Sequence, residues 1–112
     1  MGKEEGKVQR KVFKALRLLP SSYWFKLDQR NRRADFDIIG SYKGWFIGIE
    51  VKAEGEEPRP LQKLRAKQLR DTGAEVVTIQ NDAELELFIQ RMRARGEATK
   101  RRGRLQVVKD KP

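Results

Sequence analysis

The pattern that most restricts the fold lies in residues 36–52, where two short apolar runs flank a turn sequence. Residues 36–40 and 45–52 are joined by the polar residues 41–44, in which Gly44 supplies a flexible turn position. Two apolar runs of this length joined by a few turn residues are typical of a β-hairpin. With 112 residues, the chain is long enough for one compact domain built around this hairpin and too short for two.

Apolar periodicity predicts the remaining helices and strands. Spacing of three and four residues indicates amphipathic helices, and strict alternation indicates half-buried strands. The expected helices cover residues 4–19, 61–73 and 81–96, and the further expected strands cover residues 23–27 and 75–79. We expect Pro20, Gly73 and Gly96 to end the helices, and Asn81 or Asp82 to cap the last one. The predicted order is α-β-β-β-α-β-α.

Charge is concentrated at the two ends of the chain, whose formal net charge is +10. Residues 1–34 hold ten Lys or Arg and three acids, and residues 89–112 hold nine and two. Residues 35–88 reverse the balance, with eleven acids and seven bases. So strong a basic excess favours a polyanionic partner, most often nucleic acid, although solubility alone is the alternative explanation.

The basic flanks provide candidate phosphate contacts. We divide the chain into a folded domain, residues 1–96, and a basic C-terminal tail, residues 97–112, in which residues 105–108 could form a short strand. The expected nucleic-acid-binding residues are Arg30, Arg32, Arg33, Lys100, Arg101, Arg102 and Arg104. For the loop at 29–34, a solvated run of charge is the alternative.

The absence of cysteine and histidine from the sequence restricts its chemistry. It excludes a disulfide, a zinc-finger ligand set, a thiol nucleophile and an imidazole base. Any metal must be held by oxygen atoms, which favours Mg²⁺ or Mn²⁺. The longest apolar run, residues 45–47, is too short to span a bilayer, and the N-terminus lacks the apolar core of a signal peptide. We therefore expect a cytoplasmic protein without a membrane partner.

The hairpin can bring two carboxylates together. Side chains alternate along a strand, so Glu50 and Lys52 lie on one face. A two- or four-residue loop is expected to pair Asp37 with Gly48, which places Glu50 on the diagonal with backbones roughly 7–8 Å apart. The two acids could then share one cation. For Glu50 and Lys52 alone, a surface salt bridge is the alternative.

This combination suits phosphodiester hydrolysis. Carboxylates can fix a divalent cation, which neutralises the attacked phosphate and lowers the pKa of bound water. Lys52 could orient or deprotonate the attacking water, or stabilise the pentacovalent transition state. We assign the ligand role to Asp37 and not to Asp35, which lies farther from Glu50 and could pair with neighbouring arginines.

Asp37, followed by the triplet Glu50-Val51-Lys52, resembles the PD-(D/E)XK nuclease motif, with Phe36 where that motif usually has proline. The segments at 37–40, 44–52, 60–62 and 73–76 are together similar to the virus-type replication-repair nuclease (VRR-NUC) domain, over roughly residues 4–92. The resemblance implies an α/β fold with a restriction-endonuclease-like core (α-β-β-β-α-β) and a mixed central sheet flanked by helices. Residues 1–96 would then be a VRR-NUC-like nuclease domain.

The same resemblance implies an Mg²⁺- or Mn²⁺-dependent endonuclease that cuts DNA. Gln62 would face the scissile phosphate, and Val51 would lend its backbone carbonyl to the metal. Glu5, on the inward stripe of the first helix, is a further candidate metal ligand, with a solvated side chain as the alternative.

The family likeness also implies branched DNA, such as a Holliday junction, as substrate in replication, repair or recombination. It implies a homodimer and leaves a phage origin open. Trp24, Trp45 and residues 105–108 are candidates for the dimer interface.

Two other functions compete with a nuclease. One is a non-catalytic nucleic-acid-binding protein on a nuclease-like fold, and the other is a structural protein embedded in RNA. Both explain the basic flanks, but carboxylates that face phosphates give a binding protein no advantage without a cation. The choice among junction, flap, single-stranded and duplex substrates stays open, as does the number of metal ions.

Overall fold

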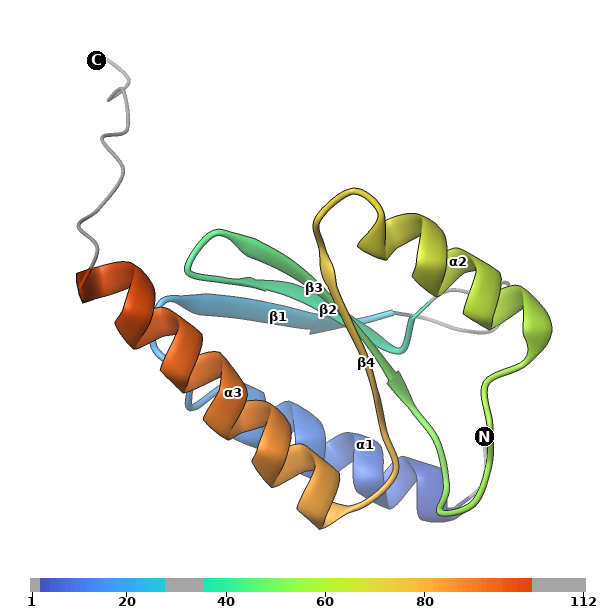
Figure 1. Ribbon diagram of the computed structural model, residues 1–112. Helices are drawn as coiled ribbons and strands as arrows, with labels where there is room; N and C mark the ends of the chain where they lie inside the picture. Colours follow the sequence, from blue (N-terminus) through green and yellow to red (C-terminus); the bar gives the residue numbers. More distant parts are fainter. Residues whose placement is uncertain (1–2, 28–35, 102–112) are drawn as a thin grey trace.

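A computed structural model describes residues 3–27 and 36–101 and shows helices packed on a central β-sheet (Figure 1). The elements are α1 (Lys3–Leu16), β1 (Ser22–Lys26), β2 (Ile38–Tyr42), β3 (Trp45–Val51), α2 (Pro60–Arg70), β4 (Glu75–Ile79) and α3 (Asp82–Arg101). The expected order of helices and strands is confirmed in this part of the chain. The expected short strand at 105–108 lies outside the described residues.

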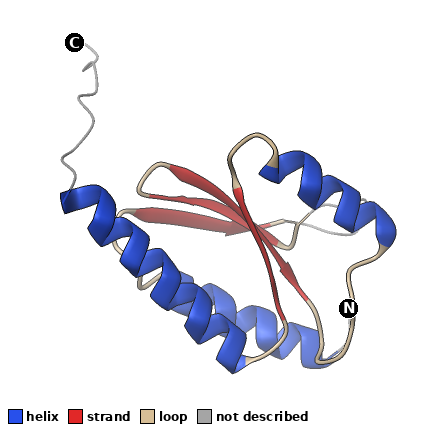
Figure 2. Cartoon of the chain, in the orientation of Figure 1, coloured by secondary structure: helices blue, strands red, loops and turns tan. Residues whose placement is uncertain are grey.

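The sheet has the strand order β1-β2-β3-β4 and is mixed. β1 and β3 each pair with β2 in antiparallel fashion, and β4 pairs with β3 in parallel. A parallel neighbour requires a crossover connection, which α2 provides between β3 and β4. Helices α1 and α3 cover one face of the sheet and α2 lies on the other (Figures 1 and 2).

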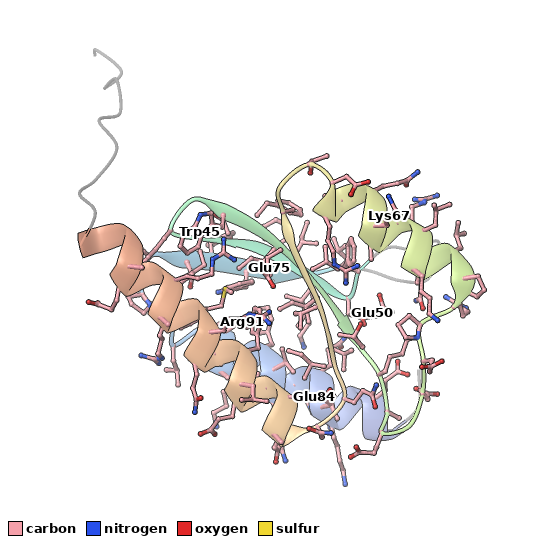
Figure 3. All side chains as sticks on the ribbon, viewed as in Figure 1. Trp45, Glu50, Lys67, Glu75, Glu84 and Arg91 are labelled. Carbon is pink, nitrogen blue, oxygen red and sulfur yellow. The ribbon has the colours of Figure 1, made fainter. Side chains whose placement is uncertain are left out.

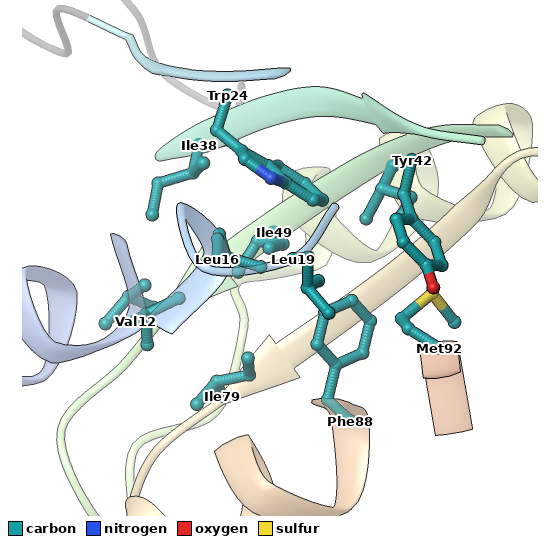
Figure 4. Close-up of a cluster of buried hydrophobic side chains, with 12 residues drawn as sticks. Val12, Leu16, Leu19, Trp24, Ile38, Tyr42, Ile49, Ile79, Phe88 and Met92 are labelled. Atoms are coloured by element: carbon teal, nitrogen blue, oxygen red, sulfur yellow. The ribbon is translucent and has the colours of Figure 1, made fainter. Parts of the chain in front are cut away.

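The hydrophobic core lies between the sheet and the helix pair α1 and α3 (Figure 4). Its fully buried side chains include Leu16 from α1, Ile47 and Ile49 from β3, and Phe88 and Met92 from α3. These residues follow the helical spacing and strand alternation of the sequence, so each element presents one apolar side to the core.

Trp24 is part of this core and not of an exposed surface. The register places it opposite Gly40, and a Cβ atom added at Gly40 would lie 2.5 Å from the Trp24 ring. The ring therefore occupies the space that a side chain at residue 40 would need. Trp45 also packs against the core, and the guanidinium of Arg95 lies 4.2 Å from its ring centroid. Both tryptophans therefore pack in or against the core, and neither is the exposed residue that we expected at a dimer interface.

The hairpin register differs from the expected one by two residues. Tyr42 pairs with Trp45 across a two-residue turn of Lys43 and Gly44, both at positive φ. Gly48 therefore pairs with Ile39 and not with Asp37. The turn is centred one residue later in the chain than the expected pairing requires, and this shift of register places Asp37 beside Glu50 and not on its diagonal.

The helix ends show one correct prediction and two wrong ones. Asn81 caps α3, since its Oδ1 atom accepts the backbone N–H of Glu84 at 2.9 Å. α1 ends at Leu16 and does not reach Pro20. Gly96 does not stop α3, which continues to Arg101. A Cβ atom at Gly96 would lie 2.6 Å from the hydroxyl oxygen of Tyr42, so this glycine permits close packing.

Candidate active site

Asp37, directly before β2, and Glu50, on β3, lie at one end of the β2–β3 hairpin. Asp37 immediately precedes the paired residue Ile38, and Glu50 immediately follows its partner Ile49. The backbone N–H of Asp37 donates to the Ile49 carbonyl at 2.9 Å, and Asp37 Oδ2 accepts the N–H of Val51 at 2.7 Å. Asp37 is 5% exposed and Glu50 is 6% exposed. The hairpin thus holds two carboxylates side by side in a largely desolvated place.

Lys52 and Gln62 both contact the carboxylate of Glu50, which lies near the carboxyl end of β3 (Figure 3). The Lys52 Nζ atom is 3.6 Å from Glu50 Oε2, and Gln62 Nε2 donates to the same oxygen at 2.7 Å. Gln62 Oε1 accepts the backbone N–H of Arg59 at 2.9 Å. Because the Gln62 oxygen is occupied in this way, its NH₂ group is directed at Glu50.

The pKa of Glu50 is raised to about 7, mainly by burial and then by the negative charge of Asp37. The positive charge of Lys52 and its hydrogen bond act in the opposite direction. The ionised form of Glu50 is therefore costly here although a lysine is nearby. A bound cation would supply the charge that the site lacks.

Glu5 lies in the first turns of α1, and its side chain forms a hydrogen bond with Glu56 of the β3–α2 connection. The amino end of α1 lies beside that connection (Figure 1). Its pKa is raised first by burial and then by a hydrogen bond with Glu56; Asp37 also raises it, and Lys52 lowers it. The pKa of Glu56 is lowered, mainly because its Oε1 atom accepts the backbone N–H of Ala53 at 2.9 Å. Glu5 thus interacts electrostatically with Asp37 and Lys52. Its role as a metal ligand stays a prediction.

A pocket of about 250 Å³ opens beside Glu50 between the sheet and α2. It is lined by Phe36, Glu50, Pro58, Gln62, Lys63, Ala66, Arg70, Val76 and Thr78. Lys63 and Arg70 bring two cations to its walls. Neither residue was predicted from the sequence, although residues 62, 63, 66 and 70 recur at the spacing of one helix face and could have been found from Gln62.

Phe36 forms part of the pocket because Gly48 leaves room for it. A Cβ atom at Gly48 would lie 3.0 Å from the Phe36 ring. The residue that replaces the usual proline of the motif therefore supplies an aromatic wall to the pocket.

The candidate phosphate-contact residues are not placed by the structure. Arg30, Arg32, Arg33, Arg102 and Arg104 lie outside the described residues. Lys100 and Arg101 belong to the last turn of α3, but their side chains are not described. Their role in binding nucleic acid stays a prediction.

The donor set at Asp37 and Glu50 fits a hard divalent cation, although no three acidic side chains in residues 3–27 and 36–101 are grouped so as to hold a metal. Mg²⁺ usually binds through one or two carboxylates and keeps several waters, with substrate phosphates as further ligands. Two buried carboxylates on neighbouring strands match that requirement. The repulsion that raises the pKa of Glu50 is also what a cation would relieve.

A mixed four-stranded sheet with helices on both faces makes this an α/β fold. The chain is similar to the solved structure of a VRR_NUC domain, with a TM-score of 0.70 and 24% sequence identity. The match covers 80% of this chain and 97% of that one. The protein therefore has the fold of a VRR_NUC domain, as the sequence implied.

Sequence comparison finds no further relative of this chain. No protein-family model matches the chain, and no curated protein matches it. Across residues 3–27 and 36–101, no helix combines the length and the apolar character needed to cross a membrane.

Proposed function

We propose that this protein is a divalent-metal-dependent nuclease that hydrolyses phosphodiester bonds in DNA. The observation that carries the proposal is the Glu50 carboxylate, buried beside Asp37 and contacted by both Lys52 and Gln62. A protein gains no stability from two buried carboxylates that repel each other, so their presence side by side favours a functional reason.

Asp37, Glu50 and the backbone carbonyl of Val51 would hold Mg²⁺ or Mn²⁺. The ion, when bound, neutralises charge on the attacked phosphate and lowers the pKa of water. Asp37 is oriented for this role by the Val51 N–H, and Glu50 by the amide of Gln62. Such supporting hydrogen bonds fix ligand geometry before a metal arrives.

The side chains around the acids would complete phosphodiester cleavage. Lys52, largely buried at 3.6 Å from Glu50, would orient the attacking water and stabilise negative charge that develops on the phosphate. Lys63 and Arg70, which line the adjacent pocket, would hold neighbouring phosphates of the strand. Gln62 would keep the Glu50 carboxylate in place beside the scissile phosphate.

The experiment that tests the proposal is incubation of the purified protein with labelled single-stranded, duplex, flap and four-way-junction DNA. Each substrate is tested with Mg²⁺, with Mn²⁺ and with chelator. We expect divalent-metal-dependent cleavage of at least one substrate and none in chelator. Binding of DNA without cleavage under every condition would instead favour the non-catalytic binding protein.

We further propose that the active form is a symmetric homodimer acting on branched DNA in replication, repair or recombination. One active site makes one nick at a time, whereas resolution of a junction needs paired nicks, which a two-fold dimer supplies most simply. Light scattering with and without junction DNA tests the dimer. A strict monomer that still cuts a junction symmetrically would contradict it.

A further inference from the structure

The face of the sheet that carries Glu50 also carries exposed aromatic rings. By the strand register, Tyr23 and Phe25 of β1 and Phe46 of β3 lie on this face, opposite the core. Tyr23 is 72% exposed, Phe25 is 45% exposed and Phe46 is 46% exposed. We call these three residues the aromatic face. Large apolar side chains that gather on one exposed face indicate a binding surface.

The aromatic face is continuous with the candidate active site. Phe25 pairs with Ile39, which in turn pairs with Gly48, so these residues form one row across the sheet. The ring of Phe36 lies over Gly48 and forms a wall of the pocket that Glu50 also lines. Aromatic rings thus lead from the edge strand to the catalytic carboxylates.

The spacing of the strand residues sets how far the aromatic face lies from the scissile phosphate. Along the strands, the Phe25 row is two residues from Glu50, or roughly 7 Å, and the Tyr23 row is four residues away, or roughly 13 Å. β1 also lies two strand spacings, or roughly 10 Å, to the side of β3. Together these offsets put Phe25 roughly 12 Å and Tyr23 roughly 16 Å from Glu50, which is about four to five nucleotides at the duplex spacing of 3.4 Å. The aromatic face is therefore within reach of bases a few nucleotides from the cut.

We propose that the aromatic face stacks unpaired bases a few nucleotides from the scissile bond and thereby selects DNA with unpaired nucleotides at that position. Bases inside a duplex already stack on their neighbours, whereas an unpaired strand offers free base faces to aromatic side chains. The rings of Tyr23 and Phe25 are 5.7 Å apart and tilted by 60°, so they are not stacked on each other. This inference rests on the proposed function only for the position of the scissile phosphate.

A second copy of the chain is a poorer occupant of this surface. A stable interface buries about 800 Å² on each partner, whereas one aromatic side chain buries at most about 250 Å². Three partly exposed rings fall short of that area. The Tyr23 hydroxyl and the exposed Ser41 beside it also make the surface amphipathic, which suits bases better than a dry protein contact.

The test measures DNA binding in chelator, so that cleavage plays no part. Tyr23→Leu and Phe25→Leu remove a ring but keep an apolar side chain, and Tyr23→Trp keeps a ring. Leu87→Ala is the matched control, because Leu87 is exposed on α3 and lies away from the aromatic face. The probes are a single-stranded oligonucleotide that carries 2-aminopurine and the blunt duplex of the same sequence.

We expect each leucine variant to bind the single strand about 5- to 100-fold more weakly, with duplex affinity nearly unchanged. The quenching of 2-aminopurine should disappear in Tyr23→Leu and return in Tyr23→Trp, and Leu87→Ala should behave as wild type. Equal losses for both probes, or no loss, would overturn the proposal. So would a dimer that dissociates in the leucine variants while DNA affinity is unchanged. If no DNA is cut with either Mg²⁺ or Mn²⁺, the proposed function fails, but the binding result still decides the role of the aromatic face.

Discussion

Gln62 donates a hydrogen bond of 2.7 Å to Glu50, although the two residues are on different elements and are separated by the whole β3–α2 connection. The Gln62 oxygen is held in turn by the backbone N–H of Arg59 at the start of α2. The amino end of α2 thus fixes one carboxylate of the candidate metal site. Formation of α2 and the geometry of the site are therefore coupled.

Replacement of Gln62 should impair the reaction without unfolding the protein. Gln62→Leu removes the donor to Glu50, and loss of such a supporting contact typically costs about 10- to 100-fold in metal affinity or activity. Gln68→Leu, on the exposed side of the same helix, is the control. Metal titration by calorimetry and cleavage assays measure the effect. An equal loss in both variants would show that α2 is merely destabilised.

Removal of either carboxylate should abolish cleavage and leave DNA binding intact. Asp37→Asn and Glu50→Gln keep the size of the side chain but remove the charge that would hold the cation. We expect no detectable cleavage with Mg²⁺ and nearly unchanged DNA affinity in chelator. Gel assays and fluorescence anisotropy provide the two measurements. Full activity in either variant, or cleavage without any divalent ion, would refute the assignment.

The raised pKa of Glu50 predicts how stability depends on pH. Between its ordinary value of 4.5 and about 7, the folded protein keeps a proton at Glu50 that the unfolded chain has lost. The free energy of unfolding due to this group therefore falls as the pH rises through that range. Glu50→Gln has no ionisable group at this position, so its free energy of unfolding should not show this fall. The difference in unfolding free energy between the variant and wild type should therefore be larger at pH 8 than at pH 4, by up to about 3 kcal/mol in favour of the variant.

Urea unfolding of both proteins in chelator at several pH values measures this gain, because the other ionisable groups largely cancel in the difference. Added Mg²⁺ at pH 8 should then stabilise wild type and not Glu50→Gln. Parallel stability curves for the two proteins would contradict the unfavourable ionisation of Glu50.

Two glycines of the hairpin should respond differently to alanine. A Cβ atom at Gly40 would lie 2.3 Å from the backbone oxygen of Tyr23, which cannot move without disturbing the sheet. We expect Gly40→Ala to destabilise the fold by about 1–3 kcal/mol through overpacking. Gly48→Ala meets only the Phe36 ring, at 3.0 Å, so it should cost less stability and mainly reduce cleavage. Thermal unfolding and cleavage assays on both variants test this difference, which equal stability losses would contradict.

The basic flanks should make DNA binding sensitive to salt. When a set of basic residues is neutralised, DNA binding should release fewer counterions. Both the affinity and the steepness of log affinity against log salt concentration should therefore decrease. The two sets to replace with glutamine are Arg30, Arg32 and Arg33, and Lys100, Arg101, Arg102 and Arg104. Binding titrations at several salt concentrations provide the measurement. An unchanged slope in both sets would show that these residues are ordinary solvated surface charges and do not contact phosphates.

The sequence by itself determined the elements and the chemistry of β3. Alternation alone placed Ile47, Ile49 and Val51 on one face of β3 and Glu50 on the other, and in the structure the three apolar residues belong to the hydrophobic core. The cap at Asn81 and the order of elements were equally predictable. These features depend on residues close together in the chain, so local periodicity and capping chemistry are sufficient to find them.

Only the tertiary structure decided how the elements meet. The position of the two-residue turn set the register that brings Asp37 to Glu50. The crossover through α2 brought Gln62, Lys63 and Arg70 to the pocket beside Glu50. Packing of α3 on Tyr42 likewise kept Gly96 inside a helix. Each of these contacts joins residues from separate elements. Their geometry follows from turn length and side-chain packing across the whole domain, which no local pattern contains.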